Sequence, residues 1–164
     1  MGSNILKTQK NLMKLILSII LCQAVGAIGA LFTSSSISIW YSQLVKPKFT
    51  PPNWLFAPVW TTLYLLMGLS LFLILIKGKE KKLKRTLFIF AIQLFLNGLW
   101  SYLFFGLRSP FYGFIEIIVL WIAILFTIVK VFKISKAAAI LLIPYIVWVT
   151  IAAALNYYIL RLNI

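Results

Sequence analysis

Five long stretches with few or no charged side chains dominate this chain of 164 residues. Four of them contain no Asp, Glu, Lys or Arg, and the fifth is interrupted only by Glu116. Each is long enough to cross a bilayer, because about 20 apolar residues span the hydrocarbon core. They comprise residues 15–45, 49–76, 86–107, 109–129 and 137–160. The pattern predicts five membrane spans.

The runs are continuously apolar, whereas the strands of a membrane barrel alternate over about 10 residues. Only helices and closed barrels satisfy the backbone in lipid, so we predict an all-α integral membrane protein. Its five transmembrane helices form a single domain over residues 1–164. The first helix should end near Phe32, before a polar run. The second helix is longer than the hydrocarbon core is thick, so it must tilt, protrude or bend at Pro58, and Pro144 should kink the last span. We place the spans near residues 12–32, 52–76, 86–106, 110–129 and 137–160.

Basic residues outnumber acidic ones by 16 to two. They lie in short clusters between the spans. This distribution is typical of residues that set the orientation of a membrane protein and not of a basic face that binds nucleic acid, so no nucleic-acid partner is expected. Twelve of them fall in the N-terminal segment and in the second and fourth connections, and four fall on the other side. The positive-inside rule therefore predicts a cytoplasmic N-terminus, and we expect a multi-pass protein of the bacterial cytoplasmic membrane.

The composition removes most catalytic chemistry. The chain has no His, a single Cys at position 22 and only two carboxylates. A His-containing triad, a His-ligated haem and a His/Cys zinc site are therefore excluded. We expect no metal site and no required cofactor.

Polar and aromatic side chains recur at helical spacing within three spans. Gln93 and Asn97 lie four residues apart on one face of the third span. Trp60 and Tyr64 share a face of the second span, and Trp148 continues a similar stripe on the last. Buried indole N–H groups need partners, which favours a pocket for a flat apolar ligand. Core packing explains the same stripes equally well, so the residues alone leave both interpretations open.

Glu116 is the one acid within a predicted span, where an ionisable side chain is a functional candidate by default. A transporter would use it for proton or cation coupling. A structural role would have it accept hydrogen bonds from a facing Tyr, Trp or amide. We favour the structural role, since no second ionisable group lies in any span to form a relay.

Several motifs, spread over most of the chain, together resemble the TspO/MBR family. These proteins are also called tryptophan-rich sensory proteins, translocator proteins or peripheral-type benzodiazepine receptors. The motifs are WYSQLVKP at residues 40–47, PP at 51–52, PVWTTLY at 58–64, QLFLN at 93–97, WS at 100–101, PY at 144–145 and LN at 155–156.

The resemblance implies a five-helix bundle, often a homodimer, that binds porphyrins such as protoporphyrin IX in a pocket closed by the first loop. Another hydrophobic small molecule or a membrane lipid is a further partner class. A sterol is included because LNYYILR at residues 155–161 matches a loose cholesterol-contact pattern, which an interfacial anchor explains equally well. By position, the family's ligand-contacting residues fall on Tyr41, Pro51, Trp60, Tyr64, Asn97, Trp100, Trp148, Ala152 and Leu155.

Three functions remain open on this basis. The first is a receptor or sensor for tetrapyrroles, with a role in their regulation or transport, and the second is a small transporter coupled through Glu116. The third is a protein that degrades porphyrin in light, a reaction that the resemblance associates with Trp60 and Trp148, so enzymatic activity is undecided.

Overall fold

The computed structural model describes residues 2–164, with side chains from Leu6 onward. Six α-helices follow one another along this part of the chain: α1 (Gly2–Ile37), α2 (Asn53–Lys77), α3 (Glu80–Ser101), α4 (Pro110–Phe132), α5 (Lys136–Ile140) and α6 (Ile143–Leu162). A 3₁₀ turn, η1 (Tyr41–Gln43), lies between α1 and α2, and a π-helical turn, η2 (Tyr102–Gly106), extends α3. The all-α prediction is confirmed.

Five stretches of the described chain are long and apolar enough to cross a membrane. They are Leu6–Ile37, Asn53–Lys77, Glu80–Gly106, Pro110–Phe132 and Lys136–Leu162, so the prediction of five spans is confirmed. Large apolar side chains such as Phe88, Phe95 and Phe126 are more than half exposed on the outer faces, as expected for a surface that faces lipid.

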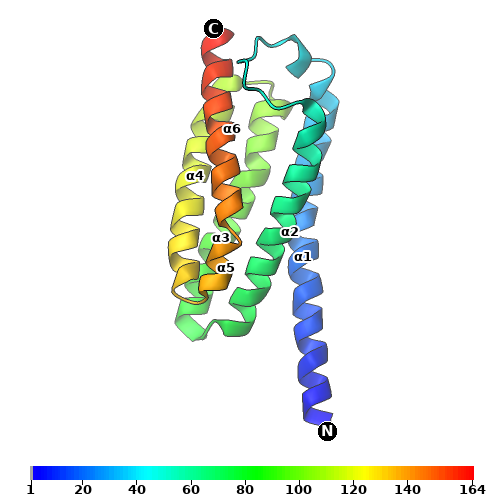
Figure 1. Cartoon of the computed structure of the whole chain (residues 1–164), viewed down its shortest axis with the longest axis vertical. Helices are drawn as coiled ribbons and strands as arrows, with labels where there is room; N and C mark the ends of the chain where they lie inside the picture. The colour runs from blue at the N-terminus through cyan, green and yellow to red at the C-terminus, as the bar shows by residue number, and fades with distance from the viewer. Residues whose placement is uncertain (1) are drawn as a thin grey trace.

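The helices form one elongated bundle (Figure 1). α1 packs against α2 and α3, α4 packs against α3 and α6, and α5 packs against α2 and α4. α1 has 36 residues, about 54 Å at 1.5 Å per residue, and its N-terminal part extends beyond the other helices (Figure 1). The segment between α1 and α2 lies at the opposite end, near the C-terminus.

The predicted end of the first helix near Phe32 is wrong, because α1 continues through the polar run to Ile37. The hydroxyls of this run bond to helix carbonyls and so do not interrupt the helix. Thr33 Oγ1 donates to the carbonyl of Gly29 at 3.1 Å, and Ser35 Oγ donates to that of Phe32 at 3.0 Å. Ser36 Oγ donates to the carbonyl of Phe105 at 2.8 Å, which ties this end of α1 to η2.

The last span is broken where a kink was predicted at Pro144. α5 ends at Ile140, and α6 begins at Ile143 with the proline in its first turn, where a missing N–H costs nothing. Ser70 Oγ of α2 donates to the carbonyl of Ala138 at 2.9 Å. The break is thus supported by a side chain from a neighbouring helix. Pro58, in contrast, lies inside the continuous helix α2.

Candidate functional site

A cavity of about 370 Å³ lies between α1 and α2 and reaches the end of α3. Ala27 and Ala30 of α1 and Ala57 of α2 are exposed members of its wall, so it opens at the outer surface of the bundle. Its size falls in the range of small-molecule sites, roughly 300–1,000 Å³. The wall consists of Gln23, Gly26, Ala27, Gly29, Ala30, Thr33, Ser34, Ile37, Asn53, Phe56, Ala57, Trp60, Thr61, Tyr64, Trp100, Ser101 and Phe105.

Small residues of α1 make room for this cavity and for the close approach of the helices. A Cβ on Gly26 would lie 2.5 Å from two ring atoms of Tyr64. A Cβ on Gly29 would lie 2.9 Å from Oγ of Ser101. The buried ring of Tyr64 would have to move to admit the first Cβ, so glycine is needed at position 26 for α1 to pack as it does, whereas the hydroxyl of Ser101 can rotate away from the second.

Aromatic rings form the inner wall. Trp60 lies stacked on Trp100 with 6.2 Å between ring centroids, and it lies 5.8 Å from Tyr64 and 6.4 Å from Tyr145. Trp100 also meets Phe105 edge-on at 5.8 Å. The π-helical turn η2 presents Phe105 to the cavity, and such turns are frequent at functional sites.

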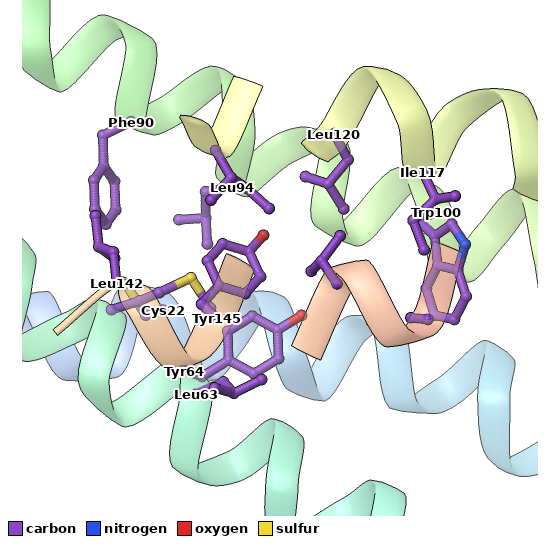
Figure 2. Packing of buried hydrophobic residues seen from close by; sticks show 14 of the residues in the cluster. Cys22, Leu63, Tyr64, Phe90, Leu94, Trp100, Ile117, Leu120, Leu142 and Tyr145 are labelled. Atoms are coloured by element: carbon purple, nitrogen blue, oxygen red, sulfur yellow. The ribbon is translucent and has the colours of Figure 1, made fainter. Parts of the chain in front are cut away.

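A hydrogen-bonded bridge supports this wall from behind. The hydroxyl of Tyr64 donates to Oδ1 of Asn97, and Nδ2 of Asn97 donates to the hydroxyl of Tyr145 at 2.7 Å. All three side chains are at least 95% buried, and the two tyrosine rings lie close together in the interior (Figure 2). The bridge joins α2, α3 and α6 at one depth.

The connection between α1 and α2 closes the same end of the bundle. Tyr41 is 4% exposed and packs on Phe104 and Phe105, with Nζ of Lys46 4.8 Å from the centre of its ring. Burial raises the pKa of Tyr41 to about 12. Asn163 fastens the connection to the end of α6, because it accepts from the backbone N–H of Val45 and donates to its carbonyl, both at 2.9 Å.

The structure brings three of the nine predicted contact residues onto the cavity wall: Trp60, Tyr64 and Trp100. Asn97 and Tyr41 lie one contact behind it, through Tyr64 and Phe105 respectively. Pro51 is half-buried just before α2.

The predicted residues of α6 lie apart from the cavity. Ala152 and Leu155 are buried in the bundle, and neither belongs to the cavity wall. Trp148 packs on Phe56, a wall residue, with 6.0 Å between the rings. Its indole N–H is buried and has no hydrogen-bond partner among the described side chains and backbone. The sequence stripes on α6 therefore contact the bundle interior, while α1 supplies the wall in their place.

Glu116 of α4 lacks the hydrogen bonds that the structural interpretation required. It is 5% exposed, and within the described part of the chain neither carboxylate oxygen has a partner. Gln93 is 1% exposed and equally without a partner at both amide atoms. The expectation that a Tyr, Trp or amide holds Glu116 is therefore wrong.

Sequence reasoning missed the contribution of α1. Glycine and alanine at positions 26, 27, 29 and 30 indicate close helix approach but not which face is hollow. It also missed Phe56, which separates Trp148 from the cavity, and Asn163, which lies outside every motif. The one sequence signal for this wall is the combination of small residues on α1 with the aromatic stripe of Trp60 and Tyr64 on the next helix.

Comparison with known proteins agrees with this architecture. The model of the TspO/MBR family matches residues 18–162. The chain is 46% identical to the tryptophan-rich protein TspO of Chlorobaculum tepidum, covering 94% of this chain and 98% of that protein. It is 46% identical to a protein of the same name from Archaeoglobus fulgidus, covering 93% and 99% respectively. It is also 36% identical to the translocator protein of Bos taurus, covering 80% of this chain and 79% of that protein. This chain therefore belongs to the TspO/MBR family of membrane proteins.

Proposed function

We propose that this protein is a membrane receptor that binds tetrapyrroles of the porphyrin class in the cavity between α1 and α2. The observation that carries the proposal is the pair of stacked indoles, Trp60 and Trp100, on the inner wall. Flat aromatic surfaces favour a flat, mostly apolar ligand through stacking.

The distribution of polar groups along the cavity supports an amphipathic ligand. Thr33, Ser34 and Asn53 lie on the side of the α1–α2 connection, at the end of α1 and the start of α2. Trp60 and Tyr64 lie farther along α2. A porphyrin can place its ring against the aromatic side chains and its carboxylates near the hydroxyl and amide groups. A few placed polar groups in an apolar site are what fixes the orientation of a ligand.

The exposed alanines of the wall allow a direct test. Ala30→Phe fills the cavity from α1, whereas Ala24→Phe adds the same ring to an exposed position of α1 outside the wall. We expect Ala30→Phe to weaken protoporphyrin IX binding at least about tenfold, roughly 1.4 kcal/mol, and Ala24→Phe to leave it unchanged. The measurement is a titration of purified protein followed by tryptophan fluorescence, with haem and cholesterol in parallel.

A third variant separates the cavity from the predicted α6 site. Ala152→Phe changes a residue on the α6 stripe that lies away from the cavity wall. If a folded Ala152→Phe protein loses affinity while Ala30→Phe retains it, the ligand binds at α6 and the cavity proposal is wrong. Equal affinity in all three variants would contradict both locations.

Coupled transport is a second candidate, favoured by the buried carboxyl of Glu116, which has no hydrogen-bond partner among the residues that the structure describes. In a transporter, Glu116→Gln should abolish substrate flux into proteoliposomes while ligand binding persists. Glu80→Gln is the matched control, because Glu80 is exposed at the start of α3. Unchanged flux in Glu116→Gln would leave the receptor as the function.

A further inference from the structure

Basic residues crowd the end of the bundle opposite the α1–α2 connection. Twelve of the chain's 16 basic residues lie there, in the first half of α1, around the α2–α3 connection and in the first turns of α3, and around the α4–α5 connection. The turns after α2 and α4 lie side by side at this end (Figure 1). The chain has two acids, and Glu116 is buried within α4, so Glu80 alone can offset this charge. The acids of the protein therefore do not balance the positive charge at this end.

One groove at this end combines charge with apolar surface. It has a volume of about 380 Å³ and lies between α3 and α4. Its basic members are Lys82, Arg85, Lys130 and Lys133, all exposed. Its apolar members include Phe88 and Ile89.

The order of these residues along α3 gives the groove a direction. Lys82, Arg85 and Ile89 lie at helical spacing on one face, with the charged members nearer the end of the bundle. Phe88, 68% exposed, follows Arg85 toward the middle of the predicted span. The basic residues Lys130 and Lys133 lie in and just after the last turn of α4. This turn lies beside the start of α3, because α3 and α4 are joined by a short turn and run in opposite directions. The groove thus changes from basic to apolar along the direction that crosses the membrane.

We propose that this groove binds an anionic phospholipid. Its phosphate lies among Lys82, Arg85, Lys130 and Lys133, and an acyl chain lies along Phe88 and Ile89. The charges recognise the headgroup, since each Lys or Arg near an anionic membrane surface adds to the attraction, and basic pockets between transmembrane helices suit lipid headgroups. A free anion uses only the basic half, whereas a lipid uses both. The proposal does not depend on the tetrapyrrole function.

Native mass spectrometry of the purified full-length protein in neutral detergent can test the site. The probes are dioleoyl phosphatidylglycerol, dioleoyl phosphatidylcholine and inorganic phosphate as a competitor. We expect retention of phosphatidylglycerol over phosphatidylcholine, with no displacement by millimolar phosphate. Displacement by phosphate, or equal retention of both lipids, would overturn the proposal.

Two matched pairs of variants locate the binding. Removing two groove charges with Arg85→Gln and Lys133→Gln should weaken phosphatidylglycerol binding at least about tenfold. Lys7→Gln with Lys10→Gln removes the same charge from α1, outside the groove, and should change binding less than about twofold. Equal losses in the two pairs would mean diffuse attraction to the basic end, and the groove would not be a site.

The apolar half has its own control on the same helix. Phe88 and Phe95 are both 68% exposed on α3, but only Phe88 lies in the groove. Phe88→Ala should weaken phosphatidylglycerol binding, and Phe95→Ala should not. An effect of both or of neither would remove the acyl chain from this groove. Because all these side chains are exposed, each variant should unfold at the temperature of the unmodified protein, which is checked first.

Discussion

The bridge through Asn97 predicts an energetic signature that packing alone would not give. Asn97→Leu removes both hydrogen bonds and leaves the hydroxyls of Tyr64 and Tyr145 buried. A buried polar group left without its partner costs about 1–3 kcal/mol. With two such hydroxyls, we expect Asn97→Leu to lower the free energy of unfolding by at least about 2 kcal/mol.

Removing the hydroxyls as well should restore much of this loss. In the triple variant with Tyr64→Phe and Tyr145→Phe, no polar group of the bridge remains buried. Only the two bonds themselves are then lost, and bonds between membrane helices average about 0.6 kcal/mol each. The triple variant should therefore lose only about 1.2 kcal/mol and be more stable than the single variant, despite two further substitutions.

Unfolding in mixed micelles with increasing dodecyl sulfate, followed by circular dichroism, measures these differences. Gln93→Leu is the control one turn away, because its amide has no partner within the described residues. Its replacement should be neutral or stabilising, since it removes a desolvated polar group. A triple variant less stable than Asn97→Leu would refute the reasoning, because the stranded hydroxyls would then not be the source of the loss.

Two further predictions concern helix packing and orientation. Gly26→Ala should destabilise the protein by about 1–3 kcal/mol, because its Cβ would lie 2.5 Å from the ring of Tyr64. Gly98→Ala is the control and should cost less, because its Cβ would lie 3.3 Å from the nearest side chain, that of Val25. The same unfolding titration compares the two variants. In a variant without the native cysteine, Ser42→Cys should react with an impermeant thiol reagent in intact cells and Lys81→Cys should not, as the positive-inside rule expects. The reverse labelling would invert the orientation.

The sequence predicts the spans well because membrane insertion is decided by hydropathy over about 30 Å of hydrocarbon. It predicts the end of α1 poorly because the same hydroxyls can cap a helix or bond back to it. At Thr33 and Ser35 the bonds run to preceding carbonyls, and the helix continues. Composition does not distinguish these outcomes, whereas the contact of Ser36 with Phe105 does, and that contact exists only in the folded bundle.

The site is predictable only where it shows as a periodic stripe. Trp60 and Tyr64 are found from the sequence because aromatic residues at helical spacing mark a face. Ala27 and Ala30 are not, because a hollow is made by the absence of side-chain atoms, and small residues indicate close packing equally well. Which of the two occurs depends on the partner helix, so the empty part of the wall is a tertiary property.

The break in the last span connects this tertiary property to a single proline. Pro144 lies in the first turn of α6, and the next residue, Tyr145, accepts the hydrogen bond of Asn97. Asn97 in turn holds Tyr64, whose ring faces Gly26 at a distance that admits no side chain. A continuous helix from Lys136 would change the rotation at which Tyr145 meets Asn97, since each helical residue turns by about 100°. The position of Tyr64 in the cavity wall is therefore linked, through Asn97 and Tyr145, to the point at which the last span is interrupted, although the break itself lies outside the wall.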